Sequence, residues 1–448
     1  MSINRRSFLH QSGILLAAGS MAQVVSSRAR ARARASAAGG YGPLIPDPEG
    51  LLDLPNGFRY RVFSSEGEAL TGGGIVPGSH DGMAAFSAGL FGTWLVRNHE
   101  LNLDDNAEDG LVPVQQEPGC TYDPEAVGGT TTLLLSHGGR LLAHRVSLSG
   151  TLDNCAGGVT PWATWLTCEE TVDSLARPHG YVFEVDPRRQ GNPEPIRAMG
   201  RFEHEAVAFS RDGSAYLSED ASGPFGCLYR FRPQQRLAGR GSLHAGGALQ
   251  AMAIDGVHSD LSIVQEPGTV LGVRWVELAN IDPADGETPV REQAIGKGAT
   301  PIQKAEGLWR GRDGTLWFTA SRGDGPDAED ADDVSAAAHS GQIWRYDPRA
   351  ETMELVVIFP SGSPFDGPDN ITVGPHGFAL VCTDGEDDQW LIAIDEQGQT
   401  FPFARNARSD DEFAGATFSP DGRTLFVNIQ GAPALTLAIT GPWAGAAR

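Results

Sequence analysis

The hydrophobic pattern of the chain repeats one short unit. Residues Ala206 to Asp220 form an alternating apolar run, an Asp-Gly turn and a second apolar run that ends in acids. Gly307 to Ser321, Ile371 to Gly385 and Ala416 to Gln430 have the same form, with His376-Gly377 at the turn of the second of these. Asp-Gly between alternating runs is the strongest short-range signal for a β-hairpin. Each segment is therefore predicted to be a hairpin.

Two looser copies of this unit lie upstream. One ends in Trp94–Glu100 and the other in Trp165–Glu170, which gives six hairpins along the chain. A strand-rich repeat without helical periodicity is typical of a propeller. The pattern predicts one all-β domain over residues 38–448, a six-bladed β-propeller with irregular loop insertions at residues 101–126 and 322–340 on its surface. A pair of β-sandwiches is the alternative, but in-phase hairpins have no reason to recur there.

Residues that can bind metals recur at equivalent places in these hairpins. One stands immediately or shortly before each first strand, and another stands where most of the second strands end. The first set is Asp81, Cys155, Glu205, Glu306, Asp369 and Glu412, and the second is Glu100, Glu169, Glu170, Glu219, Asp220 and Asp384. The innermost strand of every propeller blade faces the central channel, so equivalent positions converge on one axis. A single acid at a strand end is usually a solvated residue, but recurrence in phase predicts a ring of ligands.

Acids that converge in this way need cations. Like charges about 4 Å apart repel by roughly 1 kcal/mol in water and by more where water is excluded. Oxygen ligands suit Ca²⁺ or Mg²⁺, whereas a thiolate suits a transition metal such as iron or zinc. Cys155 on its own would equally be a small buried residue or half of a disulfide. His99 and His204 flank acids, and each is a ligand, a partner that orients a ligand, or a hydrogen-bonded structural residue.

The first residues of the chain differ in kind from the rest. Arg5 and Arg6, followed by Phe8-Leu9, precede a weakly apolar stretch and an Ala-Ser-Ala sequence that ends at Ala37. This is the pattern of a twin-arginine signal peptide over residues 1–37, and a basic disordered arm is the alternative. The apolar stretch is too short to span a bilayer stably. We expect a periplasmic or extracellular protein that the twin-arginine export machinery carries and that has no stable membrane insertion.

The charge and the cysteine content of the chain limit the classes of partner and site that it can have. The net charge of -23 disfavours nucleic acid, which an acidic surface repels. Five cysteines are an odd number for an exported chain, so at least one is free, bridges two chains or binds a metal. We assign Cys168 to the core of its blade and leave open whether Cys120 and Cys227 pair. The sequence holds no Gly-x-Ser-x-Gly elbow, P-loop, His-Glu-x-x-His or Cys-x-x-Cys motif, so nothing supports a serine triad.

The segment Asn154–Glu170 closely resembles the hallmark segment of the PhoX family of bacterial alkaline phosphatases. Asn98–Glu100, Gly200–Ala206, the Glu219-Asp220 pair and Ala305–Gly307 resemble other landmarks of that family in the same order. The resemblance implies a six-bladed propeller with Fe³⁺ and Ca²⁺ in its centre that hydrolyses phosphate monoesters. A metal-bound oxide or hydroxide would attack the phosphorus in line.

The resemblance also implies roles for particular residues. Cys155 would be an iron ligand, and Glu205 and Glu306 would be metal ligands. Lys304 stands where the phosphate-contacting arginine of the family is expected. Lysine can bind phosphate as a point charge but lacks the planar fork of arginine. We expect Lys304 and Arg322 to offset the charge that develops on the phosphoryl oxygens.

Two other functions fit a propeller with acids on its axis. A calcium-dependent lactonase or esterase would need no thiolate, so Cys155 discriminates against it. A non-catalytic exported propeller that binds a protein or a sugar would use cations for stability alone. For the phosphatase we expect small phosphorylated substrates and a monomeric protein.

Overall fold

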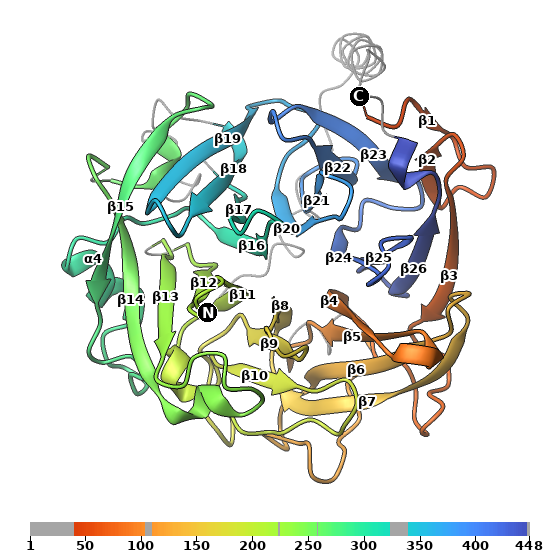
Figure 1. Ribbon diagram of the computed structural model, residues 1–448. Helices are drawn as coiled ribbons and strands as arrows, with labels where there is room; N and C mark the ends of the chain where they lie inside the picture. The colour runs from red at the N-terminus through yellow and green to blue at the C-terminus, as the bar shows by residue number, and fades with distance from the viewer. Residues whose placement is uncertain (1–39, 104–109, 223–224, 258, 323–338, 446–448) are drawn as a thin grey trace, which may run out of the picture.

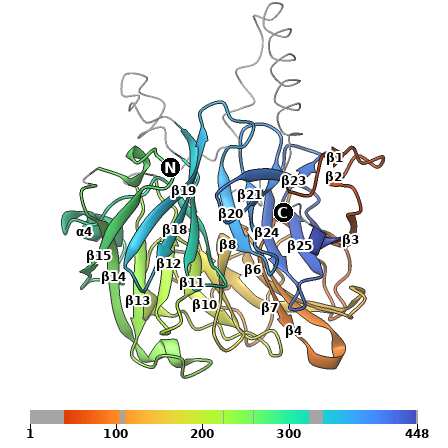
Figure 2. The same cartoon turned by 45° about the horizontal axis from the view of Figure 1, so that its top comes forward.

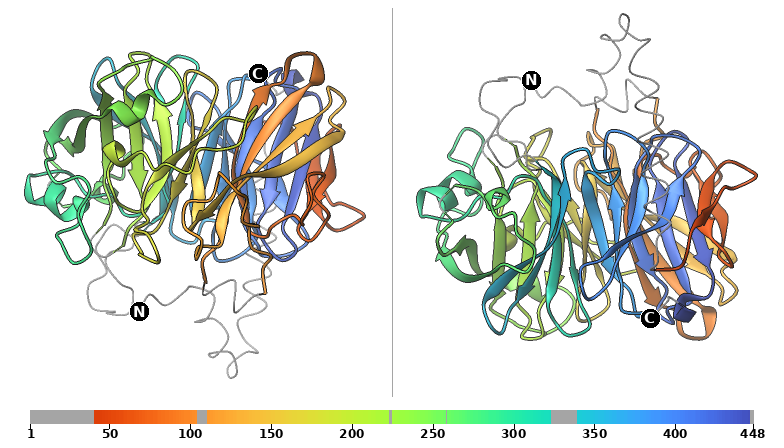
Figure 3. Two further views of the ribbon diagram at one scale, coloured as in Figure 1. Left: turned by 90° about the horizontal axis from the view of Figure 1, so that it is seen from below. Right: turned by 90° about the horizontal axis from the view of Figure 1, so that it is seen from above.

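A computed structural model of the protein describes residues 40–103, 110–222, 225–257, 259–322 and 339–445. These residues form a disc of β-sheets arranged around a central axis (Figure 1). The strands run from one face of the disc to the other, as the tilted and side views show (Figures 2 and 3). The prediction of an all-β, propeller-like fold is confirmed.

The predicted hairpins are all present, and their first strands line the axis (Figure 1). They pair β4 (His80–Ser87) with β5 (Thr93–His99), β8 (Asn154–Val159) with β9 (Trp165–Glu169), β11 (His204–Phe209) with β12 (Ala215–Glu219), β16 (Ala305–Arg310) with β17 (Leu316–Ala320), β20 (Pro368–Val373) with β21 (Ala379–Thr383), and β24 (Phe413–Phe418) with β25 (Thr424–Ile429). Each first strand contacts the first strand of the next hairpin, and β24 contacts β4, so these strands close a ring.

The remaining strands extend the hairpins outward into sheets. They are β1 (Leu44–Ile45), β2 (Leu52–Pro55), β3 (Arg59–Ser65), β6 (Gly128–Leu135), β7 (Leu141–Thr151), β10 (Val182–Val185), β13 (Leu228–Pro233), β14 (Gly247–Ile254), β15 (Val270–Glu277), β18 (His339–Asp347), β19 (Thr352–Pro360), β22 (Trp390–Ile394), β23 (Thr400–Asn406) and β26 (Leu435–Thr440). The described helices are α4 (Val290–Gly296) and the short 3₁₀ turns η1 (Gly89–Phe91), η2 (Arg197–Met199), η3 (Ser242–Ala245), η4 (Leu261–Ile263) and η5 (Trp443–Gly445).

The described strands hydrogen-bond into five sheets. One of them has nine strands with a ring strand at each end, because the outer strands β15 and β19 pair with each other. The sheet of β24, β25 and β26 is completed by β3 from the beginning of the domain. Pairing of an early strand with a late one joins the two ends of the chain and closes the disc.

The core lies between neighbouring sheets. Leu166 of one sheet packs in the same apolar cluster as Phe209 and Leu217 of the next. Because most sheets are covered on both faces, a strand such as β17, with the sequence LWFTA, is buried along its whole length. Side chains on both faces of such a strand therefore pack into the core.

Several sequence predictions about loops and cysteines have a mixed outcome. Residues 110–126 contain no regular strand, but they bury Leu111, Val114 and Tyr122, so this insertion packs against the sheets instead of lying on the surface. Most of the second predicted insertion, residues 323–338, and the predicted signal peptide, residues 1–37, lie outside the described residues.

All five cysteines are free and buried, so Cys120 and Cys227 do not pair. Among the described helices, none has the length and apolar character needed to cross a membrane.

Candidate metal centre

A β-bulge near the start of each ring strand sets the direction of its side chains. The register of every hairpin shifts there, which leaves two residues of the ring strand unpaired. The first of the two is Asp81, Cys155, Glu205, Glu306, Asp369 and, in the sixth strand, Gly415. A bulge re-aims a side chain out of the regular alternation. The sequence pattern placed one predicted ligand before each of the six first strands. Five of these ligands lie inside their strands instead, and only Glu412 precedes its strand, β24.

The chain makes a sharp turn into several of these bulges. Two residues before the bulged ligand, the backbone is left-handed at Ser79 (φ 45°), Asp153 (φ 43°), Lys304 (φ 52°) and Gly367 (φ 51°). A residue other than glycine in this region costs of order 1 kcal/mol or more. Such strain persists only where the surroundings enforce it, and it collects at functional sites. A left-handed residue at the same place before four of the bulges indicates that these four strands share one backbone arrangement.

Small residues let the ring strands approach one another closely. A Cβ atom added to Gly307 would lie 2.7 Å from the backbone nitrogen of Ile371, and one added to Gly82 would lie 2.6 Å from the carbonyl oxygen of Cys155. The axis beside these residues holds a small cavity of about 20 Å³, lined mainly by small and apolar groups. The bulged side chains therefore converge over a narrow, nearly filled axis.

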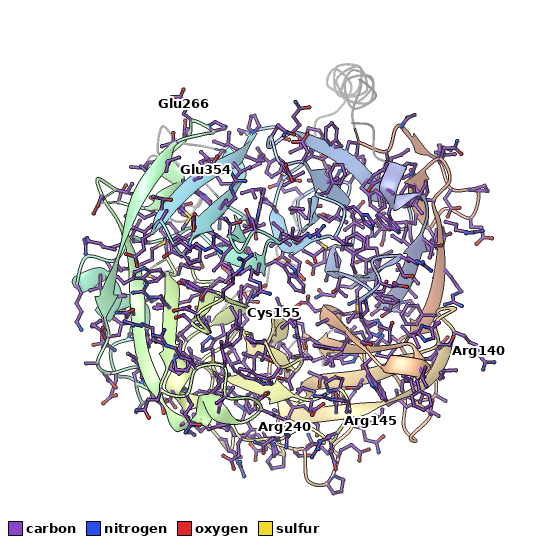
Figure 4. The ribbon with its side chains drawn as sticks, viewed as in Figure 1. Arg140, Arg145, Cys155, Arg240, Glu266 and Glu354 are labelled. Atoms are coloured by element: carbon purple, nitrogen blue, oxygen red, sulfur yellow. The ribbon has the colours of Figure 1, made fainter. Side chains whose placement is uncertain are left out.

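Two clusters of ligand-type atoms form at the centre of the disc, where Figure 4 labels Cys155. Atoms of Cys155, Glu170 and Glu205 lie within 4.8 Å of one another, and so do atoms of Glu205, Glu306 and Asp369. Glu205 belongs to both clusters, so its carboxylate stands between a site that contains sulfur and a site made of oxygen alone. The structure thus brings together residues from four different hairpins.

Electrostatics in this centre favour bound cations. Burial raises the pKa of Glu205 well above its usual range, and the nearby carboxylates of Asp369 and Glu306 raise it further. Burial likewise raises the pKa of the Cys155 thiol, and Glu205 adds to the effect. Oδ1 of Asp81 and Oε1 of Glu205 are buried and have no hydrogen-bond partner. Buried oxygens without donors and a sulfur among carboxylates are the donor set of a metal site, so these residues fit metal ions.

The ring contains further acids whose charges act on one another. Burial raises the pKa of Glu412 well above its usual range, and Asp384, Asp369 and Glu100 raise it further. Gln430 donates one hydrogen bond to Oε2 of Glu100 at 2.6 Å. Glu100, Glu170, Asp220, Asp369 and Asp384, predicted as ligands, therefore all face the group of acids on the axis.

A protein-family model matches residues 39–145 and 139–433 of the chain, and the family is described as alkaline phosphatase PhoX. These matches cover most of the chain. The chain belongs to the PhoX family. It is accordingly an alkaline phosphatase of the phosphoric monoester hydrolase class.

Solved structures of other proteins are also similar to this PhoX family member, and the first of them shares its fold. PhoX of Pseudomonas fluorescens, solved in complex with vanadate, a transition-state analogue, is 19% identical, with a TM-score of 0.68 over 90% of this chain and 98% of that one. A gluconolactonase of Xanthomonas campestris is 14% identical, with a TM-score of 0.46 over 90% of this chain and 98% of that one. No curated protein matches the chain.

Two acids predicted as ligands of the PhoX site point away from the axis. Glu169 accepts hydrogen bonds from the backbone nitrogens of Leu152, Gly180 and Tyr181, and it contacts Nδ1 of His179 at 2.6 Å. Successive residues of a strand face opposite sides, so Glu170 faces the axis and Glu169 faces the blade interior. Because Glu169 and Glu170 are adjacent at the end of the strand, the sequence alone does not show that they face opposite sides.

Glu219 has the same position in its hairpin as Glu169. Its carboxylate accepts a hydrogen bond from the Tyr229 hydroxyl at 2.5 Å and pairs with Arg291 of α4 at 3.2 Å. Burial raises the pKa of Glu219 to about 7, against the opposing effect of Arg291. The neighbouring Asp220 faces the axis and contacts Nζ of Lys304. Glu169 and Glu219, predicted as metal ligands, are therefore held by hydrogen-bond and ion-pair partners outside the two ligand clusters.

The Glu169-Glu170 pair gives a matched test of this placement. Glu169→Gln is expected to lower the free energy of unfolding by about 3 kcal/mol, because it disrupts a buried, fully bonded carboxylate, while the metal content is unchanged. Glu170→Gln is expected to lower the metal content without a comparable loss of stability in the metal-free protein. Denaturant unfolding and elemental analysis of both variants measure the two effects. Equal metal loss in the two variants would contradict the assignment.

The remaining predicted residues have distinct surroundings. Nζ of Lys304 lies 3.3 Å from Oε1 of Glu306 as well as against Asp220, so it stands at the rim of the ligand ring. Arg322 follows β17 and is partly buried at the edge of a described range, and its catalytic role stays a prediction. His99 is hydrogen-bonded to the Gly78 carbonyl and Thr131, and His204 contacts the Gly200 carbonyl. Among the described residues, neither histidine belongs to the two ligand clusters, and the buried Nδ1 of His204 has no hydrogen-bond partner.

Proposed function

We propose that the protein is an exported phosphatase that uses iron and calcium to hydrolyse phosphate monoesters at the centre of the disc. The observation that carries this proposal is the shared carboxylate of Glu205, which joins a cluster containing Cys155 to a cluster of carboxylates alone. A thiolate selects a transition metal and an all-oxygen cluster selects a hard cation. We assign Fe³⁺ to Cys155, Glu170 and Glu205, and Ca²⁺ to Glu205, Glu306 and Asp369.

Elemental analysis tests this assignment directly. Protein purified without a chelator is expected to contain both iron and calcium and to hydrolyse p-nitrophenyl phosphate. A diester and a simple lactone serve as comparison substrates, for which slower turnover is expected. Protein that contains calcium but no iron, yet is fully active, would overturn the iron site.

The chain's own residues would position the substrate and balance its charge. The ions would supply Lewis-acid polarisation of the phosphoryl oxygens and activation of the attacking water. Lys304 contacts Asp220 and Glu306, and once Glu306 binds a cation the ammonium of Lys304 would donate to a phosphoryl oxygen as well as to Asp220. The backbone of Lys304 is left-handed, and its side chain is 12% exposed, which places the residue at the rim of the ring. Lys304 would therefore stabilise charge that develops on the transferred group.

Variants of Lys304 separate this role from metal binding. Lys304→Met is expected to lower kcat/KM for p-nitrophenyl phosphate by roughly 100-fold, the magnitude typical of losing one charge-stabilising group. Lys304→Arg keeps the charge and is expected to retain most of the activity. Iron and calcium contents of both variants should match those of the unaltered protein. A Lys304→Met enzyme of normal kcat/KM would contradict the proposal.

Export through the twin-arginine route is part of this proposal. It is supported by the Arg5-Arg6 pair, the weak apolar stretch and the Ala-Ser-Ala sequence. That route carries folded proteins, which suits a protein that takes up iron before it leaves the cytoplasm. Replacement of Arg5 and Arg6 by lysine is expected to keep the active enzyme in the cytoplasm, and cell fractionation measures this. Unchanged delivery to the periplasm or medium would contradict it.

We also propose that the disc is a six-bladed propeller that acts as a monomer. Support comes from the six hairpins, each with a bulge at the same place. The nine-stranded sheet then counts as two blades whose outer strands β15 and β19 pair.

A further inference from the structure

A groove of about 430 Å³ lies between the hairpin of β11 and β12 and that of β16 and β17. It is lined by Ser210, Asp212 and Ser214 at the first turn, Gly314 at the second, and Pro348, Arg349 and Glu351 between β18 and β19. The ring acids stand at the starts of β11 and β16, so these turns lie at the opposite end of the hairpins. The groove is therefore on the face of the disc opposite the metal-ligand ring.

The lining of this groove is basic in an acidic protein. It contains Arg211, Arg230, Arg232 and Arg349, against the two acids Asp212 and Glu351, so its formal charge is 4 − 2 = +2. The whole chain has a net charge of -23. A concave surface with charge of one sign concentrates ions of the other sign. The positive charge of the groove therefore attracts anions.

Both acids of the groove already have partners. Asp212 pairs with Arg236 at 2.9 Å, and Glu351 pairs with Arg230 at 3.1 Å. Among the residues that the structure describes, the side chains of Arg232 and Arg349 have no hydrogen bond and no ion pair. Two guanidinium groups are therefore available to a ligand from outside the protein.

Arg230 forms a fixed wall of the groove. Its guanidinium lies 4.4 Å from the centre of the Trp275 ring, and its Nε donates a hydrogen bond to Oε1 of Gln250 at 2.8 Å. Tyr216 lines the groove beside it. A planar guanidinium offers paired N–H groups whose spacing matches two oxygens of a phosphoryl group. A cavity of this volume is in the range of small-molecule sites.

We propose that this groove is a second anion site, separate from the metal centre, that binds a small ligand with two or more phosphoryl-type groups. Arg232 and Arg349 make the principal contacts, and Arg230 on its tryptophan platform fixes the position of the ligand. The volume of the groove and its separate arginines select a ligand larger than orthophosphate. This inference rests on the groove alone and stands independently of the function proposed for the metal centre.

Methylenediphosphonate is a suitable probe, because it carries two phosphoryl-type groups and no ester bond to hydrolyse. Isothermal titration of the metal-loaded protein with this probe is expected to show a groove site whose affinity falls as salt is added. The double variant Arg232→Gln/Arg349→Gln is expected to lose this site or to weaken it at least tenfold. Its activity towards p-nitrophenyl phosphate should be unchanged, since neither residue is near the ligand ring.

A second double variant controls for the loss of two charges. Arg59 and Arg423 are exposed and lie outside the groove, so Arg59→Gln/Arg423→Gln should bind the probe as the unaltered protein does. Probe binding that is identical in the groove variant, the control and the unaltered protein would overturn the proposal. Orthophosphate is expected to bind at least tenfold more weakly than the probe. Equal affinity of the groove for orthophosphate would overturn the selection for a larger ligand.

Discussion

Cys155→Ser is expected to remove iron from the protein and to reduce phosphatase activity by about 1000-fold, which corresponds to the loss of several kcal/mol of Lewis-acid stabilisation. Serine has nearly the same size, so the bulge and the packing around it should survive. A hydroxyl, unlike a thiolate, is a poor ligand for a transition metal. Elemental analysis and the visible thiolate-to-iron absorption measure the loss of iron, and turnover of p-nitrophenyl phosphate measures the loss of activity.

Cys168 provides the matched control for this experiment. It is also a fully buried thiol, but it belongs to neither of the two clusters of ligand-type atoms. Cys168→Ser is expected to lower stability by about 1–3 kcal/mol, the usual penalty for a buried hydroxyl without a partner, and to leave the iron content unchanged. An iron content in Cys155→Ser equal to that of Cys168→Ser would refute the thiolate site.

Complete removal of the metals is expected to destabilise the fold as well as to abolish activity. Each tightly bound ion contributes about 4 kcal/mol when its concentration is 1,000 times its dissociation constant. Two ions would then contribute about 8 kcal/mol, and at about 2.1 cal/mol/K of unfolding entropy per residue this amounts to roughly 5–10 °C in Tm. The physical cause is repulsion among acids such as Asp369, Glu306 and Asp384, which no cation then screens.

Calorimetry before and after treatment with a chelator measures this change. Restoring calcium alone is expected to recover part of the lost Tm without the activity, because the Cys155 cluster stays without its metal. Restoring both metals should recover both properties. A Tm that does not respond to the chelator, in protein shown to be free of metal, would contradict the idea that the acids depend on cations.

The hairpins and their convergence could be predicted from the sequence because each carries its own local signals. Asp212-Gly213 and Asp313-Gly314 mark turns, and both glycines have positive φ in the structure. A hairpin register fixes which residues meet, so phase alone was enough to bring Cys155, Glu205 and Glu306 to one axis.

The direction of each side chain was not predictable in the same way. Glu169 and Glu170 are adjacent acids, and the sequence gives no sign that only one of them finds three backbone donors and a histidine. Those donors belong to segments that come close only after the sheet has formed. The bulges also escaped detection, because a register shift depends on the partner strand and leaves no signature in a single chain. The groove arginines come from one strand, β13, and from two turns that are far apart in the sequence, so no motif identified them.

The pairing of β3 with β26 has a consequence for how the protein is made. Acids of the ring come from the first hairpin, at Asp81, and from the region just before the last, at Glu412. Until the ribosome has released β26, the last sheet lacks an edge and the two ends of the chain cannot meet. A prematurely terminated chain would therefore never assemble the whole set of ligands. Closure of the ring of acids is therefore expected to come last, after the residues of the two ligand clusters have already been synthesised.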